Sequence, residues 1–318
     1  MNDPDFRVHR IALPPAGRLV PATCQFNGRG GVRGAPIRRR IFESPYLEPT
    51  TDEEHAAAVQ WLVGHHLLFF YWAGGAYTAQ RAATAIRAGA LGDAIRWMNR
   101  MSTLIHGSVG AMVTSARFSA SLYADFIRPS MVRCRPDFSA KSAPDHIAMM
   151  IAYQEVKEAL NAAGFLVSAA QRHRIPPALV AANSAMNQAM ATWLKEHHAI
   201  VARFLGRGAT SLLDDEVQRM LGELAQNATE GFDKATYIRE VIRGADAQVA
   251  YDAYFGVVRA EVTPQELAAT LISVLDMVYR HLWPGISYRH WSWMAAGDSL
   301  LHQTITELVV EEPVALAA

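Results

Sequence analysis

A histidine at the centre of an apolar helical stripe is the strongest candidate for chemistry in this chain of 318 residues. In the segment 184–206, one face of a predicted helix carries His197 together with apolar side chains spaced three or four residues apart. His198 lies about 100° further around the helix. The helical phase therefore predicts that His197 points inward, either as a core residue with one hydrogen bond or as a ligand of haem iron. The apolar side chains on this stripe are Met186, Met190, Trp193, Ile200 and Phe204.

Two adjacent histidines lie in a second segment, 57–73, which is apolar almost all round and predicts a buried helix. His65 shares a stripe with Trp61 and Trp72, whereas His66 falls on the neighbouring stripe. Burial lowers the pKa of an imidazole and favours its neutral form, which can accept or relay a proton. Both histidines are therefore candidates for acid–base catalysis. The alternative is aromatic packing, with one of them bonded to a polar partner.

An arginine follows the apolar face of a third segment, 115–131, directly before a proline. The residue before a proline is disfavoured in the α conformation, so we expect Arg128 to be held at a helix end. A guanidinium in that position is suited to bind a carboxylate. The alternative is an exposed arginine, which the helix dipole favours near a helix C-terminus.

The first of these segments resembles the helix that carries the axial histidine of tryptophan 2,3-dioxygenase. That helix has Trp four residues before the ligand, Val four after, Arg six after and Gly nine after. The same offsets occur here as Trp193, His197, Val201, Arg203 and Gly206. The resemblance implies that His197 is the proximal ligand of haem iron and that Trp193 and Arg203 contact the cofactor.

The loop after this segment extends the resemblance. In the dioxygenases a Gly/Thr-rich loop follows the axial helix and contacts the amino-acid substrate. Residues 206–211 are similar to that loop, although the glycine pair of the family is not intact. The resemblance implies that Thr210 or its neighbour Ser211 holds the amino group of the substrate.

A distal histidine with a tryptophan six residues later also characterises the dioxygenases, and His66 and Trp72 have this offset. The resemblance implies a catalytic role for His66, with His65 as the alternative distal residue. Arg128 lies 62 residues after His66, which is close to the spacing of the arginine that binds the substrate carboxylate in the family. The resemblance thus implies that Arg128 binds the substrate, together with Tyr123 on the same apolar segment.

The chain is more closely similar to the bacterial haem-dependent L-tyrosine hydroxylases of the same superfamily, through its size and the string Phe-Ile-Arg-Pro-Ser-Met at 126–131. This resemblance implies an all-α, tryptophan-dioxygenase-like haem domain. It also implies hydroxylation of L-tyrosine to L-DOPA, with hydrogen peroxide as the oxidant, in the biosynthesis of specialised metabolites such as antibiotics. The implied assembly is a homo-oligomer in which the N-terminal arm crosses between subunits.

The cysteines bear on how haem would be held. One relative in the bacterial branch binds haem covalently through a His-x-x-x-Cys motif. Here the position four residues before Cys24 is Val20, and the position four residues before Cys134 is Ser130. We therefore expect non-covalent haem b.

Other functions stay open at this point. A tryptophan or indole 2,3-dioxygenase using O2 differs in substrate and oxidant, and a non-catalytic haem or amino-acid binding protein could use the same residues. His290 or His302 would replace His197 as the axial ligand if the resemblance misleads. The acidic run at 214–216 resembles the start of a terpene-synthase motif, but the second metal motif is missing, and the run more simply opens a helix at 213–227.

Helix-forming residues dominate the chain after Pro49. Thr51 and the residues beside it offer capping oxygens at the first helix. We expect one all-helical haem domain at 51–318 and an irregular arm rich in Arg, Pro and Gly at 1–50. An aromatic-rich stretch, 279–293, is expected to form a loop. The expected helices cover 52–73, 76–89, 92–107, 110–128, 144–171, 176–205, 213–227, 233–255, 264–282 and 297–310.

Composition and charge exclude several classes of protein. Lys+Arg and Asp+Glu are both 30, so the chain is formally neutral, although residues 1–40 carry eight Arg and two Asp. A general nucleic-acid binder would need a basic excess, and no apolar run is long enough to span a bilayer. The first residues lack a signal sequence, and two cysteines cannot build a disulfide framework. We expect a cytoplasmic enzyme that acts on a small aromatic amino acid and has no nucleic-acid or membrane partner.

Overall fold

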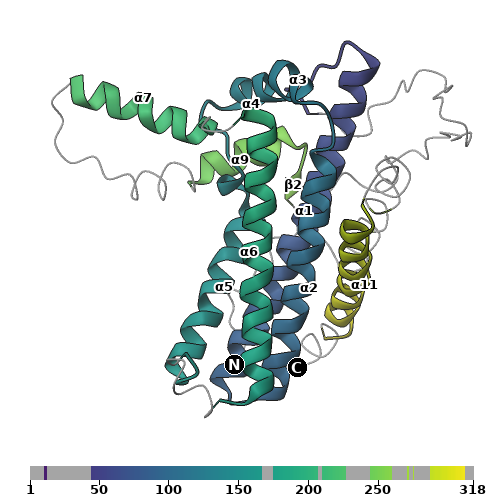
Figure 1. Ribbon diagram of the computed structural model, residues 1–318, viewed down its shortest axis with the longest axis vertical. Helices are drawn as coiled ribbons and strands as arrows, with labels where there is room; N and C mark the ends of the chain where they lie inside the picture. The colour runs from purple at the N-terminus through teal and green to yellow at the C-terminus, as the bar shows by residue number, and fades with distance from the viewer. Residues whose placement is uncertain are drawn as a thin grey trace, which may run out of the picture.

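Four long helices run side by side along the length of the molecule (Figure 1). The computed structural model describes residues 11–12, 44–166, 175–206, 210–226, 244–259, 271, 275 and 287–311. Helices hold most of these residues and the strands are a single two-residue pair, which confirms the expected all-α fold class. The four helices are α1 (Asp52–Arg87), α2 (Leu91–Ser115), α5 (Pro144–Ala162) and α6 (Pro177–Leu205).

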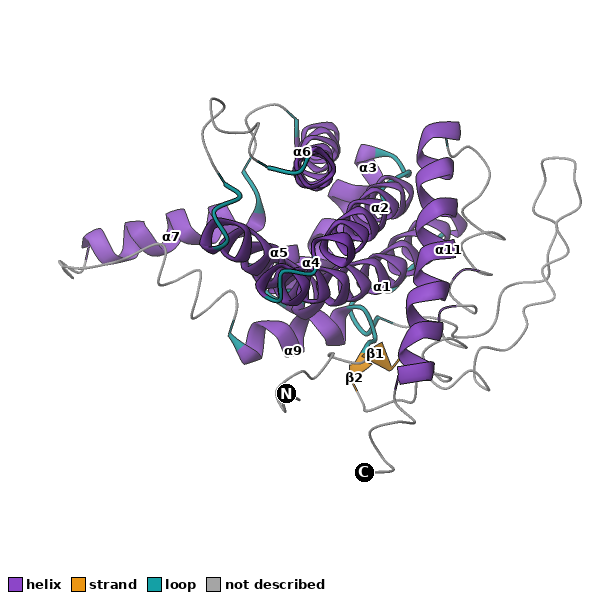
Figure 2. Ribbon diagram, turned by 90° about the horizontal axis from the view of Figure 1, so that it is seen from below, coloured by secondary structure: helices purple, strands orange, loops and turns teal. Residues whose placement is uncertain are grey.

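Helix α1 packs along α2 and α5, and α2 packs along α6 and α11. Helix α11 lies on the side of the bundle away from α5 and α6 (Figure 2). The shorter elements gather at one end of the long helices, where α7 projects away from the bundle (Figure 1). No helix among the described residues has both the length and the apolar content that crossing a membrane requires. The remaining elements are β1 (Ile11–Ala12), α3 (Ala120–Leu122), a π-helical turn (Tyr123–Ile127), α4 (Arg128–Cys134), a 3-10 turn (Ala140–Ser142), α7 (Leu212–Gln226), α9 (Ala245–Tyr254), β2 (Val258–Arg259) and α11 (Tyr288–Glu311).

The N-terminus of α1 is closed by side chains at the position that the sequence predicted. The hydroxyl oxygen of Thr51 accepts a hydrogen bond from the backbone N–H of Glu54 (3.2 Å), and the Glu54 carboxylate accepts one from the backbone N–H of Thr51 (3.1 Å). Such a capping box satisfies two N–H groups that lack helical partners. It fixes where α1 begins and therefore which faces its later residues present.

The helix breaks predicted at 74–75 and 108–109 are wrong, because α1 and α2 continue through these positions. Glycines at or beside these positions allow the helices to pack closely instead. The two helices expected between residues 52 and 89 form the single helix α1, with Gly74 inside it. A Cβ atom on Gly74 would lie 2.7 Å from Cδ2 of Leu301 in α11. A Cβ atom on Gly107, inside α2, would lie 2.5 Å from the ring of Tyr71 in α1. Both glycines let neighbouring helices approach closely, so the histidines of α1 sit on one continuous helix.

The C-terminal helix also begins earlier than expected. The predicted loop at 279–293 is wrong for its last six residues, since α11 starts at Tyr288. Tyr71 of α1 donates hydrogen bonds to the carboxylate of Asp298 and to the carbonyl oxygen of Met294 (3.1 Å), which anchors α11 against α1. Most of the helix expected at 264–282 lies outside the described residues.

The described part of the N-terminal arm contacts the body of its own chain. Ile11 and Ala12 pair antiparallel with Arg259 and Val258, respectively (Figure 2). The other residues of 1–43 lie outside the described residues. The division of the chain at residue 50 stays a prediction.

Candidate active site

His65 and His66 lie side by side in the middle of α1, and both are buried. The Nδ1 atom of His65 donates a hydrogen bond to the carbonyl oxygen of Trp61 (2.7 Å), one turn earlier in the helix. The Nε2 atom of His66 donates to the carbonyl oxygen of Phe255 (2.7 Å), just after α9. Because a carbonyl oxygen only accepts, these bonds assign the neutral rings opposite tautomers. His65 therefore carries its lone pair on Nε2, whereas Nε2 of His66 is occupied by the carbonyl.

Burial keeps both imidazoles neutral. Desolvation lowers the pKa of His65 to about 3, and it outweighs the opposing hydrogen bond to Trp61. Desolvation likewise lowers the pKa of His66 to about 4, against the hydrogen bond to Phe255. Both rings are therefore neutral near pH 7, the form in which one ring nitrogen donates a hydrogen bond and the other carries a lone pair.

Aromatic rings hold His65 in one orientation. Its ring stacks on Phe255, with 4.5 Å between the centroids and 20° between the planes. The ring of Trp61 lies 4.1 Å away on its own helix and meets Tyr123 edge-on at 6.3 Å. His65 is therefore connected to the segment that carries Arg128 through a single intervening ring.

Arg128 occupies the junction between the π-helical turn and α4. Pro129 has no N–H, and its ring hinders the carbonyl of Asp125, so the preceding turn widens. The N–H of Arg128 accordingly bonds to the carbonyl oxygen of Tyr123. The expectation that Arg128 ends a helix is wrong, because it has helical angles (φ −60°, ψ −44°) and the helix continues to Cys134. The widened turn brings Tyr123 and Arg128 together, and such turns are frequent at functional sites.

Tyr123 forms a buried wall beside the arginine. Its ring lies parallel to that of Phe204 in α6, with 4.3 Å between the centroids and 3° between the planes. Burial raises the pKa of the Tyr123 phenol, and the positive charge of Arg128 offsets part of this rise. The contact joins the end of α6 to the segment that carries the arginine.

The guanidinium of Arg128 binds a carboxylate within its own chain. Nη2 of Arg128 lies 2.9 Å from Oδ2 of Asp215 in the first turn of α7. The hydroxyl of Thr210 donates a hydrogen bond to the other oxygen of the same carboxylate. The side chains of Arg128 and Asp215 are 23% and 48% exposed, respectively. The two residues predicted to bind the carboxylate and the amino group of a substrate thus meet at one acidic side chain.

Ser211 has a local role at the start of α7. Its Oγ atom accepts a hydrogen bond from the backbone N–H of Asp214 (3.1 Å) and donates one to the Asp214 carboxylate (2.8 Å). Glu216 pairs with Arg219, three residues later in the same helix. The predicted helix start is confirmed. Residues 207–209 of the predicted substrate loop lie outside the described residues.

His197 is half-buried in α6 and His198 is exposed, which confirms the predicted helical phase. The ring of His197 stacks on Trp193, with 5.3 Å between the centroids and 4° between the planes. Burial lowers the pKa of His197, and the charges of His198 and Lys141 act in the same direction. The ring is therefore neutral at pH 7, the form in which an imidazole binds a metal.

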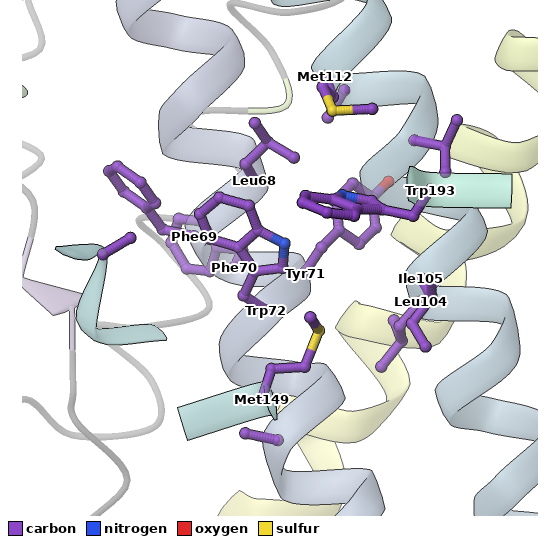
Figure 3. Packing of buried hydrophobic residues seen from close by; sticks show 14 of the residues in the cluster. Leu68, Phe69, Phe70, Tyr71, Trp72, Leu104, Ile105, Met112, Met149 and Trp193 are labelled. Atoms are coloured by element: carbon purple, nitrogen blue, oxygen red, sulfur yellow. The ribbon is translucent and has the colours of Figure 1, made fainter. Parts of the chain in front are cut away.

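A path of ring contacts connects His197 with the histidines of α1. Beyond Trp193 it passes to His146 in α5 (5.5 Å) and from there to Trp72 in α1 (5.1 Å). Figure 3 shows Trp72 of α1 and Trp193 of α6 among the buried residues of the core. The path continues through Phe69 (6.0 Å) to His66 (6.0 Å). A series of ring contacts thus joins His197 of α6 to His66 of α1, and the two histidines are separated by four intervening rings.

The residues beside His197 fit a haem group. The Nε1 atoms of Trp72 and Trp193 are buried and have no hydrogen-bond partner among the described residues. Buried donors normally have acceptors, and the carboxylates of a haem could supply them here. The neutral imidazole of His197, stacked on one of these indoles, offers the nitrogen ligand that haem iron commonly takes.

Arg203, the third residue predicted to contact the cofactor, has a partner within the bundle. Its guanidinium donates a hydrogen bond to the carbonyl oxygen of Ala116 at the end of α2. It also lies 4.6 Å from the centroid of the Phe204 ring. These contacts join α6 to α2, and contact of Arg203 with a cofactor stays a prediction.

Three residues of this region were not among the sequence-based candidates. Asp215 was expected only to open a helix, and nothing local indicates its pairing with an arginine 87 residues away. His146 is an isolated histidine near the start of α5, and only packing places it between two tryptophans. Phe255 contributes a backbone carbonyl, for which a sequence carries no signal.

The alternative axial ligands lie on α11. His290 is bonded through Nδ1 to the hydroxyl of Ser287 (2.8 Å), and His302 is exposed. The thiol of Cys134 donates a hydrogen bond to the carbonyl oxygen of Ala250 (3.4 Å), and Cys24 lies outside the described residues.

Comparison with known families found a match over the first half of the chain. The family described as SfmD 3-methyl-L-tyrosine peroxygenase matches residues 20–176. The matched range includes both histidines of α1, His146 and Arg128, whereas α6 and the elements after it lie beyond it. No curated protein matched the chain.

Proposed function

Because the chain belongs to the haem-dependent peroxygenases that modify tyrosine and its derivatives, we propose that it hydroxylates L-tyrosine to L-DOPA with hydrogen peroxide as the oxidant. The proposed position of reaction is the ring carbon ortho to the phenol hydroxyl. The alternative substrates, tryptophan and indole, have no support from the family match.

One observation carries the proposal more than any other. A guanidinium suited to a carboxylate and a neutral imidazole with its Nε2 lone pair are connected through two aromatic rings, in the order Arg128, Tyr123, Trp61 and His65. An aromatic amino acid has its carboxylate and its reactive ring at opposite ends. A site with the same order of groups suits such a substrate.

Substrate binding is assigned to the Arg128 end of this series. Arg128 would bind the carboxylate of tyrosine through its guanidinium fork, and Thr210 or Ser211 would hold the amino group. Tyr123, fixed by its stack on Phe204, would support the substrate from one side. The partial exposure of Arg128 leaves this end within reach of a small molecule.

Proton transfer is assigned to the histidines of α1, and the tautomers support His65 over His66. The Nε2 atom of His65 can accept a proton from hydrogen peroxide and return it to the leaving oxygen, since its Nδ1–H is held by Trp61. Nε2 of His66 is bonded to Phe255, so we assign His66 the role of fixing the end of α9 against α1.

Cofactor binding is assigned to α6. Haem supplies the chemistry by which peroxide oxidises the aromatic ring. His197 would be its proximal ligand, and Trp193 and Arg203 would contact it, with the buried indole N–H groups as donors to its carboxylates. We propose non-covalent haem b, because no histidine lies four residues before either cysteine. We further propose a homo-oligomer that serves the biosynthesis of specialised metabolites.

Product analysis tests the function. Purified haem-loaded protein is incubated with L-tyrosine and hydrogen peroxide, with 3-methyl-L-tyrosine and hydrogen peroxide, and with L-tryptophan and O2. The expected result is L-DOPA from L-tyrosine, identified by chromatography and mass. Turnover of 3-methyl-L-tyrosine and not of L-tyrosine would identify the substrate as the one that the family description names. Product from tryptophan with O2 would contradict the proposal. Haem binding without any product would indicate a binding protein.

A further inference from the structure

The ion pair between Arg128 and Asp215 links two elements far apart in the chain. Arg128 begins α4, and Asp215 lies in the first turn of α7, where the helix dipole favours a carboxylate. Both oxygens of the Asp215 carboxylate are engaged, one by Arg128 (2.9 Å) and the other by the hydroxyl of Thr210. The neighbouring acids Asp214 and Glu216 bond to Ser211 and Arg219 in the same segment, whereas Asp215 reaches α4.

The Asp215 carboxylate thus contacts the same guanidinium, that of Arg128, to which the proposed function assigns the substrate carboxylate. Because Asp215 contacts Nη2 of Arg128, an amino acid whose carboxylate binds the guanidinium through both oxygens competes with Asp215 for that nitrogen and displaces it. The displaced side chain would then lie beside the α-amino group, because in an α-amino acid the ammonium is one carbon away from the carboxylate. With its 48% exposure, the Asp215 side chain has open space into which it can turn.

We infer that Asp215 is a specificity-determining residue, which covers Arg128 in the empty site and binds the α-ammonium of the substrate in the occupied one. This inference rests on the proposed function, since it requires a free aromatic amino acid as the ligand. The Arg128–Asp215 pair and a zwitterionic amino acid are each neutral overall. In the complex the ligand carboxylate would bind Arg128 and the ligand ammonium would bind Asp215.

The same arrangement disfavours ligands that lack one charge. A des-amino acid would displace Asp215 from Arg128 without offering it a cation, which leaves a carboxylate beside the incoming carboxylate. Asp215 would thus select L-tyrosine over 3-(4-hydroxyphenyl)propanoate, which has the same ring and carboxylate but no amino group.

Calorimetric titration of the haem-loaded full chain with these two ligands tests the inference. The matched variants are Asp215→Asn and Asp214→Asn, which remove one acidic charge from adjacent positions. In Asp215→Asn, the dissociation constant of L-tyrosine should rise about fivefold, as expected for a partly exposed ion pair. That of 3-(4-hydroxyphenyl)propanoate should fall, so the preference for the amino acid collapses. Asp214→Asn should keep the preference of the parent protein.

Other outcomes separate the inference from the function on which it rests. If Asp215→Asn weakens both ligands by the same factor, or leaves their ratio unchanged, Asp215 only ties α7 to α4 and the inference is wrong. If the parent protein keeps its haem and binds neither ligand, the proposed function itself fails. A variant that merely unfolds cannot bind the propanoate more tightly, so the gain in that affinity distinguishes the inference from loss of structure. Asp215→Glu, which keeps the charge, should restore the preference.

Discussion

The imidazole of His146 stacks on the indole of Trp193, with 5.5 Å between the ring centroids and 23° between the planes. On its other side the same imidazole contacts Trp72, at 5.1 Å. Three helices, α1, α5 and α6, therefore meet at one histidine. His146 of α5 thus links the ring series that ends at His66 to the one that ends at His197, the proposed proximal ligand.

The assignment of the proximal ligand predicts different results for two adjacent histidines. His197→Ala should lose the Soret band of the bound haem, or weaken haem binding at least about tenfold. His198→Ala should bind haem as the parent does, because its side chain is exposed on the other face of α6. Haem titration followed by absorbance measures both, with circular dichroism to verify that the helices are intact. Loss of haem from the His198 variant alone would refute the helical-phase assignment.

The tautomers of the two histidines in α1 predict which of them moves protons. His65→Gln should lower peroxide-dependent turnover roughly a hundredfold or more while haem and L-tyrosine still bind. His66→Gln should mainly lower the free energy of unfolding, by ~1 kcal/mol, because it disturbs the hydrogen bond to Phe255. Turnover numbers and denaturant unfolding separate the two effects. A larger loss of turnover in the His66 variant would reverse the assignment.

Substrate binding should depend on Arg128 and not on a second arginine of the same helix. Arg128→Ala should raise the dissociation constant of L-tyrosine by roughly tenfold to a hundredfold, since a charged hydrogen-bond partner is lost. Arg133 of α4 donates to the carbonyl of Tyr46 instead, so Arg133→Ala should bind L-tyrosine as the parent does. Calorimetry measures both, and haem absorbance serves as the control. An equal loss of haem and tyrosine binding in the Arg128 variant would refute its role with the carboxylate.

The buried histidines should make the protein sensitive to mild acid. Their pKa values of about 3 and about 4 lie below the ordinary value, so the unfolded chain takes up protons at a higher pH than the folded one. About one pH unit or more above pH 6.5, neither state is appreciably protonated at these positions. Between about pH 6.5 and pH 4 the free energy of unfolding should therefore fall, by up to ~3 kcal/mol per pH unit for the two groups together.

Denaturant unfolding of the haem-free protein at pH 7, 6 and 5 measures this dependence. The double variant His65→Gln, His66→Gln should show a shallower decline. His198→Gln, which changes an exposed residue, should follow the parent. Identical slopes in the double variant and the parent would show that these two histidines do not titrate on unfolding.

Two glycines of α2 should respond oppositely to the same substitution. Gly107→Ala places a Cβ atom 2.5 Å from the Tyr71 ring and should lower the free energy of unfolding by ~1–3 kcal/mol. Gly92→Ala meets nothing within 4 Å and should raise it by ~0.5–1 kcal/mol, because alanine loses less chain entropy in a helix. Denaturant unfolding measures both changes. A stabilised Gly107 variant would contradict the close packing of α1 against α2.

Features that depend on near neighbours in the chain could be predicted from the sequence. The orientations of His197 and His198 follow from the 3.6-residue period, and the cap at Thr51 follows from side chains three residues apart. The start of α7 follows from Ser211 and the acids after it. Each of these depends on the backbone conformation of one helix, which local residues specify.

Helix breaks were predicted less well, because the same residue can end a helix or allow two helices to touch. Gly74 and Gly107 lie inside helices since neighbouring side chains fill the space above them. Arg128 keeps a helical conformation before Pro129, because a widened turn removes the clash that would otherwise end the helix. Only the surrounding structure distinguishes these cases.

The sequence by itself determined the helical composition, the inward face of α6 and the residue types available for acid–base and carboxylate chemistry. Only the tertiary structure decided their partners, because those partners are distant in the chain. Phe255 lies 189 residues from His66, and Asp215 lies 87 residues from Arg128. A hydrogen bond of this kind forms only when packing brings the donor and acceptor atoms of two elements within about 3 Å of each other. Local periodicity specifies which face of a helix is buried, and tertiary packing specifies what that face meets.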